Sequence, residues 1–164
     1  MLFRSFPELK DPELYATRKI EFEKIVAAAL DKHGLRGPKA DPKTPLILQT
    51  FGQQTAKNLA QMKIGVPVML LIGDPTGFQT PDQVKAWKGI VQGFGPAKQI
   101  VERNPDFVKW AHAEGISVTP YTVTSRQPSG SFTDVTAEMS HFLYRSEEHT
   151  SELQSLAYLV CRLL

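Results

Sequence analysis

Val66-Pro67-Val68-Met69-Leu70-Leu71-Ile72 is the longest mostly apolar stretch of the chain, and it decides the fold class. Its apolar residues are continuous rather than alternating, which is typical of a strand buried on both faces in a parallel sheet that helices cover. Leu46-Ile47-Leu48 and the segment from Ile116 to Val123 are further apolar runs of strand length. Leu2 to Phe6 is predicted to form another strand.

Amphipathic stretches lie between these runs. The apolar residues from Tyr15 to Lys32 recur at helical spacing, and Gly34 follows where a glycine commonly ends a helix. Thr80-Pro81-Asp82-Gln83 has the sequence of a capping box with proline at the first helical position. Further helices are predicted at Gln53 to Met62, from Asn104-Pro105 to Gly115, and at Asp134 to Tyr144. This alternation of strand and helix predicts an α/β fold with a parallel sheet.

Length and composition narrow the classes of protein. The chain has 164 residues, whereas a complete α/β barrel needs about 250, so an incomplete barrel is expected. A hydrophobic content of 41% fits a globular protein. The net charge of +2 comes with scattered basic residues, so nucleic acid is not expected as a partner. No apolar run approaches the roughly 20 residues of a membrane span.

The last 20 residues have the character of laboratory sequence. Residues 145–155 read Arg-Ser-Glu-Glu-His-Thr-Ser-Glu-Leu-Gln-Ser, which is the first-frame translation of a common short-read sequencing adapter. We therefore divide the chain into a protein domain at residues 1–144 and an adapter-derived tail at residues 145–164. The only cysteine, Cys161, lies in that tail, so no disulfide within the chain is possible.

Polar and aromatic residues follow several of the predicted strands. In a parallel α/β barrel the active site lies at the carboxyl ends of the strands. The candidates at those ends are Glu8, Lys10, Gln49, Phe51, Asp74, Tyr121 and Thr122. Glu8 and Lys10 share one face of an extended segment, so the carboxylate could bind a cation and the ammonium a phosphate. They could equally form a solvated ion pair that contributes about 0–1 kcal/mol.

Five short motifs resemble, in order, the periplasmic-type glycerophosphodiester phosphodiesterases. Pro7-Glu8-Leu9-Lys10-Asp11-Pro12 is similar to the family's Pro-Glu-x-Lys-x-Pro segment, and Leu48-Gln49-Thr50-Phe51 to its Gln-Ser/Cys-Phe strand end. Gly93-Phe94-Gly95-Pro96 resembles its Gly-Ile-Gly-Pro turn. Residues 111–118 and 120–123 resemble its Ala-His-x-x-Gly-Leu-x-Val and Pro-Tyr-Thr block. The resemblance covers residues 7 to 144.

The resemblance implies a (β/α)8 barrel of which this chain carries roughly the later half. It implies hydrolysis of a small glycerophosphodiester to glycerol 3-phosphate and an alcohol, with Ca²⁺ or Mg²⁺ as cofactor. Glu8 matches a metal ligand and Lys10 a substrate contact. Gln49, Phe51 and Tyr121 match positions that line the substrate pocket, although core packing is the alternative for Phe51 and Tyr121. A periplasmic or extracellular location is also implied.

The family's catalytic histidines, its His-Arg-Gly motif and its Glu-x-Asp metal pair lie upstream of the segment that contains Glu8, and none occurs here. No catalytic residue is therefore predicted in this chain. His33, His112 and His141 fall within or at the ends of predicted helices, so we expect them on helix surfaces.

The chain is expected to be a truncated record of a longer enzyme that is inactive and poorly soluble alone, because an open half-barrel exposes strand edges and apolar faces. The alternatives are a non-catalytic barrel remnant or binding module, and a phosphoinositide-type phospholipase. Neither the oligomeric state nor the preferred head group can be read from the sequence.

Overall fold

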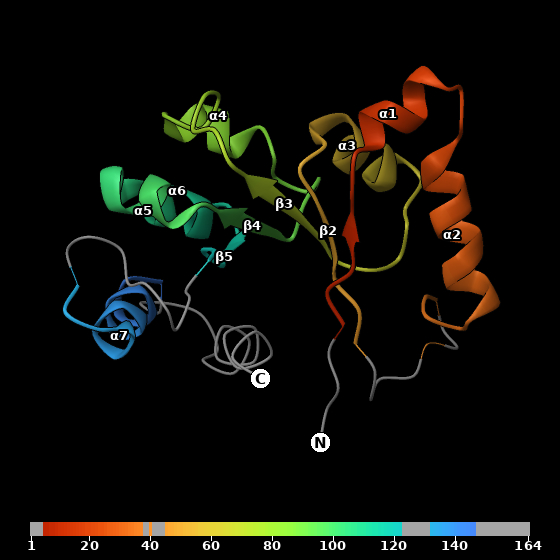
Figure 1. Cartoon of the computed structure of the whole chain (residues 1–164). Helices are drawn as coiled ribbons and strands as arrows, with labels where there is room; N and C mark the ends of the chain where they lie inside the picture. Colours follow the sequence, from red (N-terminus) through yellow and green to blue (C-terminus); the bar gives the residue numbers. More distant parts are fainter. Residues whose placement is uncertain (1–4, 38–39, 41–44, 123–131, 147–164) are drawn as a thin grey trace.

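The described residues form one parallel sheet. The structure, a computed structural model, describes residues 5–37, 40, 45–122 and 132–146 (Figure 1). The five strands are β1 (Glu8–Leu9), β2 (Leu48–Thr50), β3 (Val68–Ile72), β4 (Gly93–Pro96) and β5 (Ser117–Val118). Their order in the sheet is their order in the chain, and every neighbouring pair is parallel. Right-handed crossovers in a sheet of this order place all connecting helices on one face, as in a (β/α)8 barrel.

Helices follow each strand. They are α1 (Pro12–Thr17), α2 (Phe22–Lys32), α3 (Gln53–Gln61), α4 (Pro81–Lys85), α5 (Lys98–Arg103), α6 (Asp106–Ala113) and α7 (Val135–Ser146). Figure 1 shows α1, α2 and α3 beside β1 and β2, and α4, α5 and α6 beside β3 and β4. The fold is therefore an open part of a barrel, as the sequence predicted. No helix in the described part of the chain has the length and apolar character to cross a membrane.

The two faces of the sheet differ in chemistry. The register aligns Leu9, Thr50, Leu70, Phe94 and Val118 across the five strands on the face that the helices cover. All five residues are buried, and the four apolar ones belong to the hydrophobic core. This outer face therefore carries the packing between sheet and helices.

The inner face carries smaller and more polar residues. The adjacent row consists of Glu8, Gln49, Met69, Gly93 and Ser117. The glycines of β4 leave room for neighbouring side chains, because a Cβ added at Gly95 would lie 2.6 Å from Cδ2 of Leu71, and one at Gly93 would lie 2.8 Å from Oγ of Ser117 and 3.2 Å from Cε of Met69. The β4 glycines thus let the side chains of β3 lie across the neighbouring strand.

The structure corrects two predicted elements near the N-terminus. The helix predicted over residues 15–32 is two helices, because Lys19 adopts a left-handed φ of 55° after α1. The turn lets the rings of Tyr15 and Phe22 stack with centroids 4.4 Å apart. The first described strand is Glu8–Leu9, and residues 2–4 of the strand predicted over residues 2–6 lie outside the described residues. Of that predicted strand, Ser5 makes an isolated bridge to Leu46.

Two elements were not predicted, namely β4 and α5. Gly93-Phe94-Gly95-Pro96 has low intrinsic strand propensity, and the six residues of α5 are too few for a helical period. Pairing with β3 and β5 forms the strand in spite of its sequence. The polar loop predicted at Arg126 to Ser131 lies outside the described residues.

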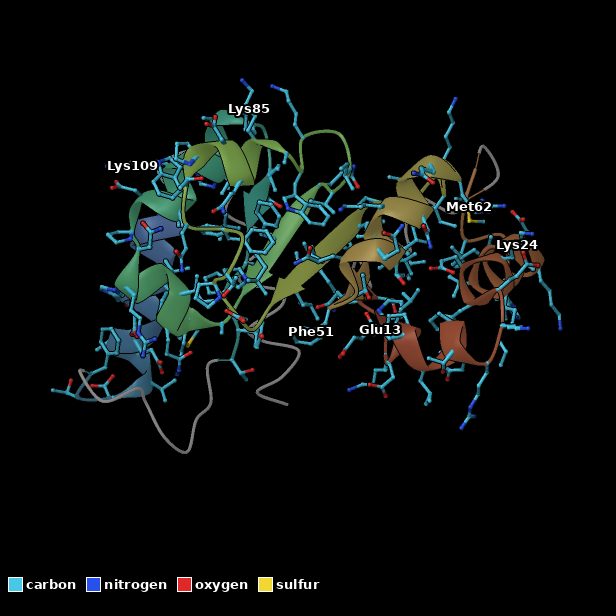
Figure 2. All side chains as sticks on the ribbon, turned by 90° about the horizontal axis from the view of Figure 1, so that it is seen from above. Glu13, Lys24, Phe51, Met62, Lys85 and Lys109 are labelled. Carbon is cyan, nitrogen blue, oxygen red and sulfur yellow. The ribbon has the colours of Figure 1, made fainter. Side chains whose placement is uncertain are left out.

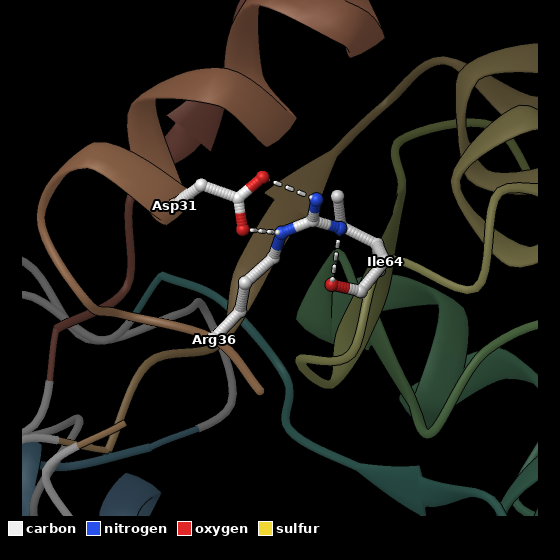
Figure 3. A network of polar contacts seen from close by, with 3 residues as sticks. All are labelled: Asp31, Arg36 and Ile64. Atoms are coloured by element: carbon white, nitrogen blue, oxygen red, sulfur yellow. Dashed lines mark hydrogen bonds and ion pairs between the residues drawn. The ribbon is translucent and has the colours of Figure 1, made fainter. Parts of the chain in front are cut away.

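Local signals at helix ends are confirmed. Thr80 caps α4 in a full capping box with Gln83, and Gly34 follows α2 with a φ of 62°. Near that end, Asp31 accepts hydrogen bonds from Nε and Nη2 of Arg36 at 2.7 and 2.6 Å (Figure 3). Arg36 Nη1 also donates to the carbonyl of Ile64 at 3.2 Å. This network ties the segment after α2 to the segment after α3.

Candidate active site

The end of β1 places two opposite charges together. Nζ of Lys10 lies 3.5 Å from Oε2 of Glu8, with the two side chains 73% and 25% exposed. Asp11 then takes a left-handed conformation with φ 49° and ψ 44°, and Pro12 begins α1. Asparagine and aspartate tolerate this conformation better than most residues do. The sharp turn leaves Lys10 accessible at the carboxyl end of the strand.

The loop after β2 packs directly on this turn. A Cβ added at Gly52 would lie 2.5 Å from Cγ of Pro12 and 3.2 Å from Oε1 of Glu13. The hydroxyl of Thr50 accepts a hydrogen bond from the Gly52 amide at 3.0 Å and donates to the carbonyl of Leu9 at 3.3 Å. Figure 2, a view from above, labels Phe51 in the loop after β2 and Glu13 in the first turn of α1. The ends of β1 and β2 therefore form one connected surface.

Gln49 is buried in the sheet and does not lie in an open pocket. Its side chain is buried, and Nε2 donates to the carbonyl of Phe6 at 2.8 Å. This hydrogen bond links β2 to the chain before β1. Gln49 thus faces the inner side of the sheet, as its predicted role requires, while its amide nitrogen serves a structural contact.

Phe51 and Tyr121 meet above Gly73, although one follows β2 and the other follows β5. Their ring centroids are 6.0 Å apart at an interplanar angle of 88°. A Cβ added at Gly73 would be 3.6 Å from the Tyr121 hydroxyl and 3.7 Å from Cε1 of Phe51. Phe51 remains 48% exposed, and the Tyr121 hydroxyl donates to the Ile72 carbonyl at 3.4 Å. The rings form an aromatic pair at the carboxyl end of the sheet.

Asp74 is a further polar residue at this end. One carboxylate oxygen accepts hydrogen bonds from the amide of Thr76 at 2.9 Å and from its hydroxyl at 2.8 Å. These bonds, the amide bond first, hold the pKa of Asp74 below its ordinary value. Asp74 is therefore a stable carboxylate that is held by its own loop. Thr122 is half-buried, and no interaction assigns it a role.

The described residues do not supply a complete metal centre. No group of three histidine, cysteine, aspartate or glutamate side chains surrounds a common point within residues 5–37, 40, 45–122 and 132–146. Glu8 is a suitable oxygen ligand for Ca²⁺ or Mg²⁺, but one carboxylate is far short of the six to eight oxygens that Ca²⁺ takes. The fit of a divalent cation to these residues is thus partial.

The three described histidines are not alike. His33 is exposed at the end of α2, as expected. His112 and His141 are half-buried instead, because His112 lines a cavity and the ring of His141 packs on Phe132 at 4.9 Å. The expectation of a surface position was therefore wrong for these two residues.

That cavity, of about 440 Å³, lies on the inner face toward the amino ends of the strands, and its lining includes Met69, Gly93 and Ser117 from the row of Glu8. Phe6, Ile47, Met69, His112 and Ser117 are among its lining residues. The amino end of an α/β barrel serves stability rather than catalysis, so the carboxyl end remains the better candidate site.

Two charged residues near the site were missed by sequence reasoning. Lys98 and Glu138 form a buried ion pair, with side chains 9% and 0% exposed. Lys98 follows the Gly-Phe-Gly-Pro strand directly, but nothing in its sequence context indicates burial. Glu138 lies on the same helix as Phe142 with a spacing of four, which places it on the buried face.

Comparisons with known proteins concern the family and the fold of the chain. Residues 5–145 match the glycerophosphoryl diester phosphodiesterase family. The fold is similar to the crystal structure of a glycerophosphodiester phosphodiesterase from Parabacteroides distasonis, with a TM-score of 0.57 and 17% identity over 96% of this chain and 56% of that one. A candidate racemase from Roseobacter denitrificans matches with a TM-score of 0.40 and 12% identity, over 92% of this chain and 54% of that one. No curated protein sequence matches. The chain thus spans little more than half the length of these solved structures.

Proposed function

Because the chain belongs to the glycerophosphoryl diester phosphodiesterase family, we propose that the carboxyl end of its sheet is part of a site for hydrolysis of glycerophosphodiesters to glycerol 3-phosphate and an alcohol. One observation supports this most strongly. Glu8 on β1, Lys10 after β1, Phe51 after β2 and Tyr121 after β5 all follow the inner-face alternation of their strands, and the last three lie beyond the carboxyl ends. A charged pair beside an aromatic surface suits a phosphate attached to glycerol.

Lys10 is proposed to bind the phosphate. Its ammonium is exposed and paired only loosely, at 3.5 Å, with Glu8. A phosphodiester oxygen can therefore replace or join the carboxylate as an acceptor without desolvating a buried charge. Such a contact is a charge-assisted hydrogen bond, of the stronger kind in proteins.

Glu8 is proposed to contribute one oxygen ligand to a divalent cation, Ca²⁺ or Mg²⁺, whose other ligands lie outside the described residues. A bound cation would neutralise charge on the phosphoryl oxygens. At Glu8 itself, cation binding would compete with the Lys10 ammonium and release it toward the substrate. Phe51 and Tyr121 would provide the surface against which the glycerol carbons pack.

A binding experiment tests the site. We expect glycerol 3-phosphate to bind the purified chain weakly, with a millimolar dissociation constant in a ³¹P NMR titration. Lys10→Met should weaken binding about tenfold, in line with loss of one charge-assisted hydrogen bond. Lys85→Met is the matched control, since Lys85 is an exposed residue at the end of α4 (Figure 2). Equal affinities of the two variants would exclude Lys10 as a phosphate contact.

Hydrolysis by the isolated chain is not expected. The general acid and base of a phosphodiester hydrolysis need side chains within hydrogen-bonding reach of the substrate. Of the described histidines, His33 lies at the end of α2, His112 lies at the amino end of the sheet, and the ring of His141 packs on Phe132. Release of glycerol 3-phosphate from glycerophosphocholine by the purified chain would contradict this part of the proposal. The periplasmic or extracellular location remains a prediction.

A further inference from the structure

The buried pair of Lys98 and Glu138 joins two parts of the chain close to the aromatic pair. Lys98 is the first residue of α5, next but one after the last residue of β4. Its ammonium donates to Oε1 of Glu138, which lies in the first turn of α7. The two residues are 40 positions apart, so the contact is purely tertiary.

The backbone of Lys98 also holds Tyr121. The Lys98 amide donates to the Tyr121 carbonyl at 2.8 Å, and the Tyr121 amide donates to the Pro96 carbonyl at 2.9 Å. Lys98 therefore fastens the chain at two points, at Tyr121 through its amide and at Glu138 through its side chain. Both points flank the connection from β5 to α7.

Energetics argue for a role beyond stability. Among the ion pairs of the described residues, this is the only one in which both side chains are less than a tenth exposed. Removing two charges from water costs free energy. A protein with well-packed apolar residues of similar volume in place of a buried ion pair is often equally stable or more stable. What an ion pair adds over an apolar contact is a defined direction, because the hydrogen bond fixes where each end lies.

We propose that Lys98 and Glu138 are positioning residues that fix Tyr121, and through it the ring pair with Phe51, at the carboxyl end of the sheet. The role of that ring pair as a substrate surface rests on the proposed function. The positioning itself does not, since it concerns only the attachment of Tyr121. The pair acts by holding α7 against Lys98, so that the Lys98 amide stays aligned with the Tyr121 carbonyl.

Amide hydrogen exchange by NMR tests this inference in the full chain. In Glu138→Gln, we expect the Lys98 and Tyr121 amides to exchange about tenfold faster or more, while the Leu70 and Phe94 amides at the sheet centre change less than about twofold. The nuclear Overhauser cross-peaks between the ring protons of Phe51 and Tyr121 should weaken in the same variant. The matched control is Glu114→Gln, which removes the partly exposed Lys88–Glu114 pair at 2.9 Å and should leave the Tyr121 amide unchanged.

A double variant distinguishes the positioning of Tyr121 from the overall stability of the fold. Lys98→Met with Glu138→Leu removes both charges and should keep the urea midpoint near that of the parent chain. We still expect faster exchange at Tyr121, because an apolar contact lacks the directional bond. The inference is overturned if the Tyr121 amide exchanges as in the parent chain, or if all sheet amides speed up equally. These outcomes do not depend on whether glycerol 3-phosphate binds, so a failure of the proposed function would be seen separately.

Discussion

The two faces of the sheet differ in the residues that they carry. The outer face is filled with large apolar side chains that pack on helices, as Leu70, Phe94 and Val118 do. The inner face carries glycines, a buried amide and, at its carboxyl end, the Glu8–Lys10 pair and the Phe51–Tyr121 rings. The buried side chains of the outer face stabilise the fold. The carboxyl end of the inner face can therefore carry exposed charges and an exposed ring.

The sharpest test of this division compares two phenylalanines. Phe94 on the outer face is fully buried and lies 5.6 Å from the rings of both Phe78 and Phe107, whereas Phe51 is 48% exposed. Phe94→Ala should lower the free energy of unfolding by about 3–5 kcal/mol. Phe51→Ala should lower it by less than about 1 kcal/mol. Urea denaturation measures the free energy of unfolding of both variants. Similar decreases would mean that the two residues contribute equally to core packing, which contradicts the division between the faces.

Two glycines of the inner face give a smaller effect. The Cβ of Gly95→Ala would lie 2.6 Å from Cδ2 of Leu71 and 3.3 Å from Sδ of Met69, so the β3 side chains must shift. We expect a destabilisation of about 1–3 kcal/mol, as for other overpacked interiors. Gly73→Ala is the control, because its nearest neighbours would be at ordinary contact distances of 3.6 and 3.7 Å. Equal melting temperatures of the two variants would contradict the packing described for β3 and β4.

The smallest expected effect is a pH dependence outside both faces. The side-chain hydrogen bond from Arg36 holds the pKa of Asp31 below its ordinary value of 3.8. A carboxyl with a lowered folded pKa stabilises the fold above its unfolded pKa, and this contribution is lost as the pH falls through the folded pKa. The parent chain should therefore lose more stability below about pH 4 than Arg36→Met does. Parallel urea midpoints of the two proteins down to pH 2 would show that the pair is not linked to folding.

Much of the outer face could be predicted from sequence. The unbroken apolar run that ends at Ile72 indicated a doubly buried parallel strand, and Thr80 with Gln83 indicated the start of α4. These features depend on local chemistry, namely side-chain burial and hydrogen bonding within one helical turn. The family resemblance then gave the barrel, and the order of the strands confirmed it.

The inner face was harder to predict, because its features depend on contacts between distant segments. Gly93-Phe94-Gly95-Pro96 forms a strand because it pairs with adjacent strands of the sheet. Lys98 is buried in a contact with Glu138, which lies 40 residues further along the chain. Glu8 and Lys10 were candidates from their place in the sequence, and the resemblance implied their roles, whereas the meeting of Phe51 with Tyr121 requires the folded sheet. The roles assigned to these residues in substrate and metal binding remain predictions.

The most direct test of the central claim is a footprint of glycerol 3-phosphate on the ¹⁵N-labelled chain. Amide shifts recorded during titration show which end of the sheet the ligand contacts. The account predicts shifts at Lys10, Phe51, Gly73 and Tyr121, at the carboxyl ends of the strands, and unchanged amides at Ile47, His112 and Ser117 around the opposite cavity. Shifts confined to the residues of that cavity would contradict it.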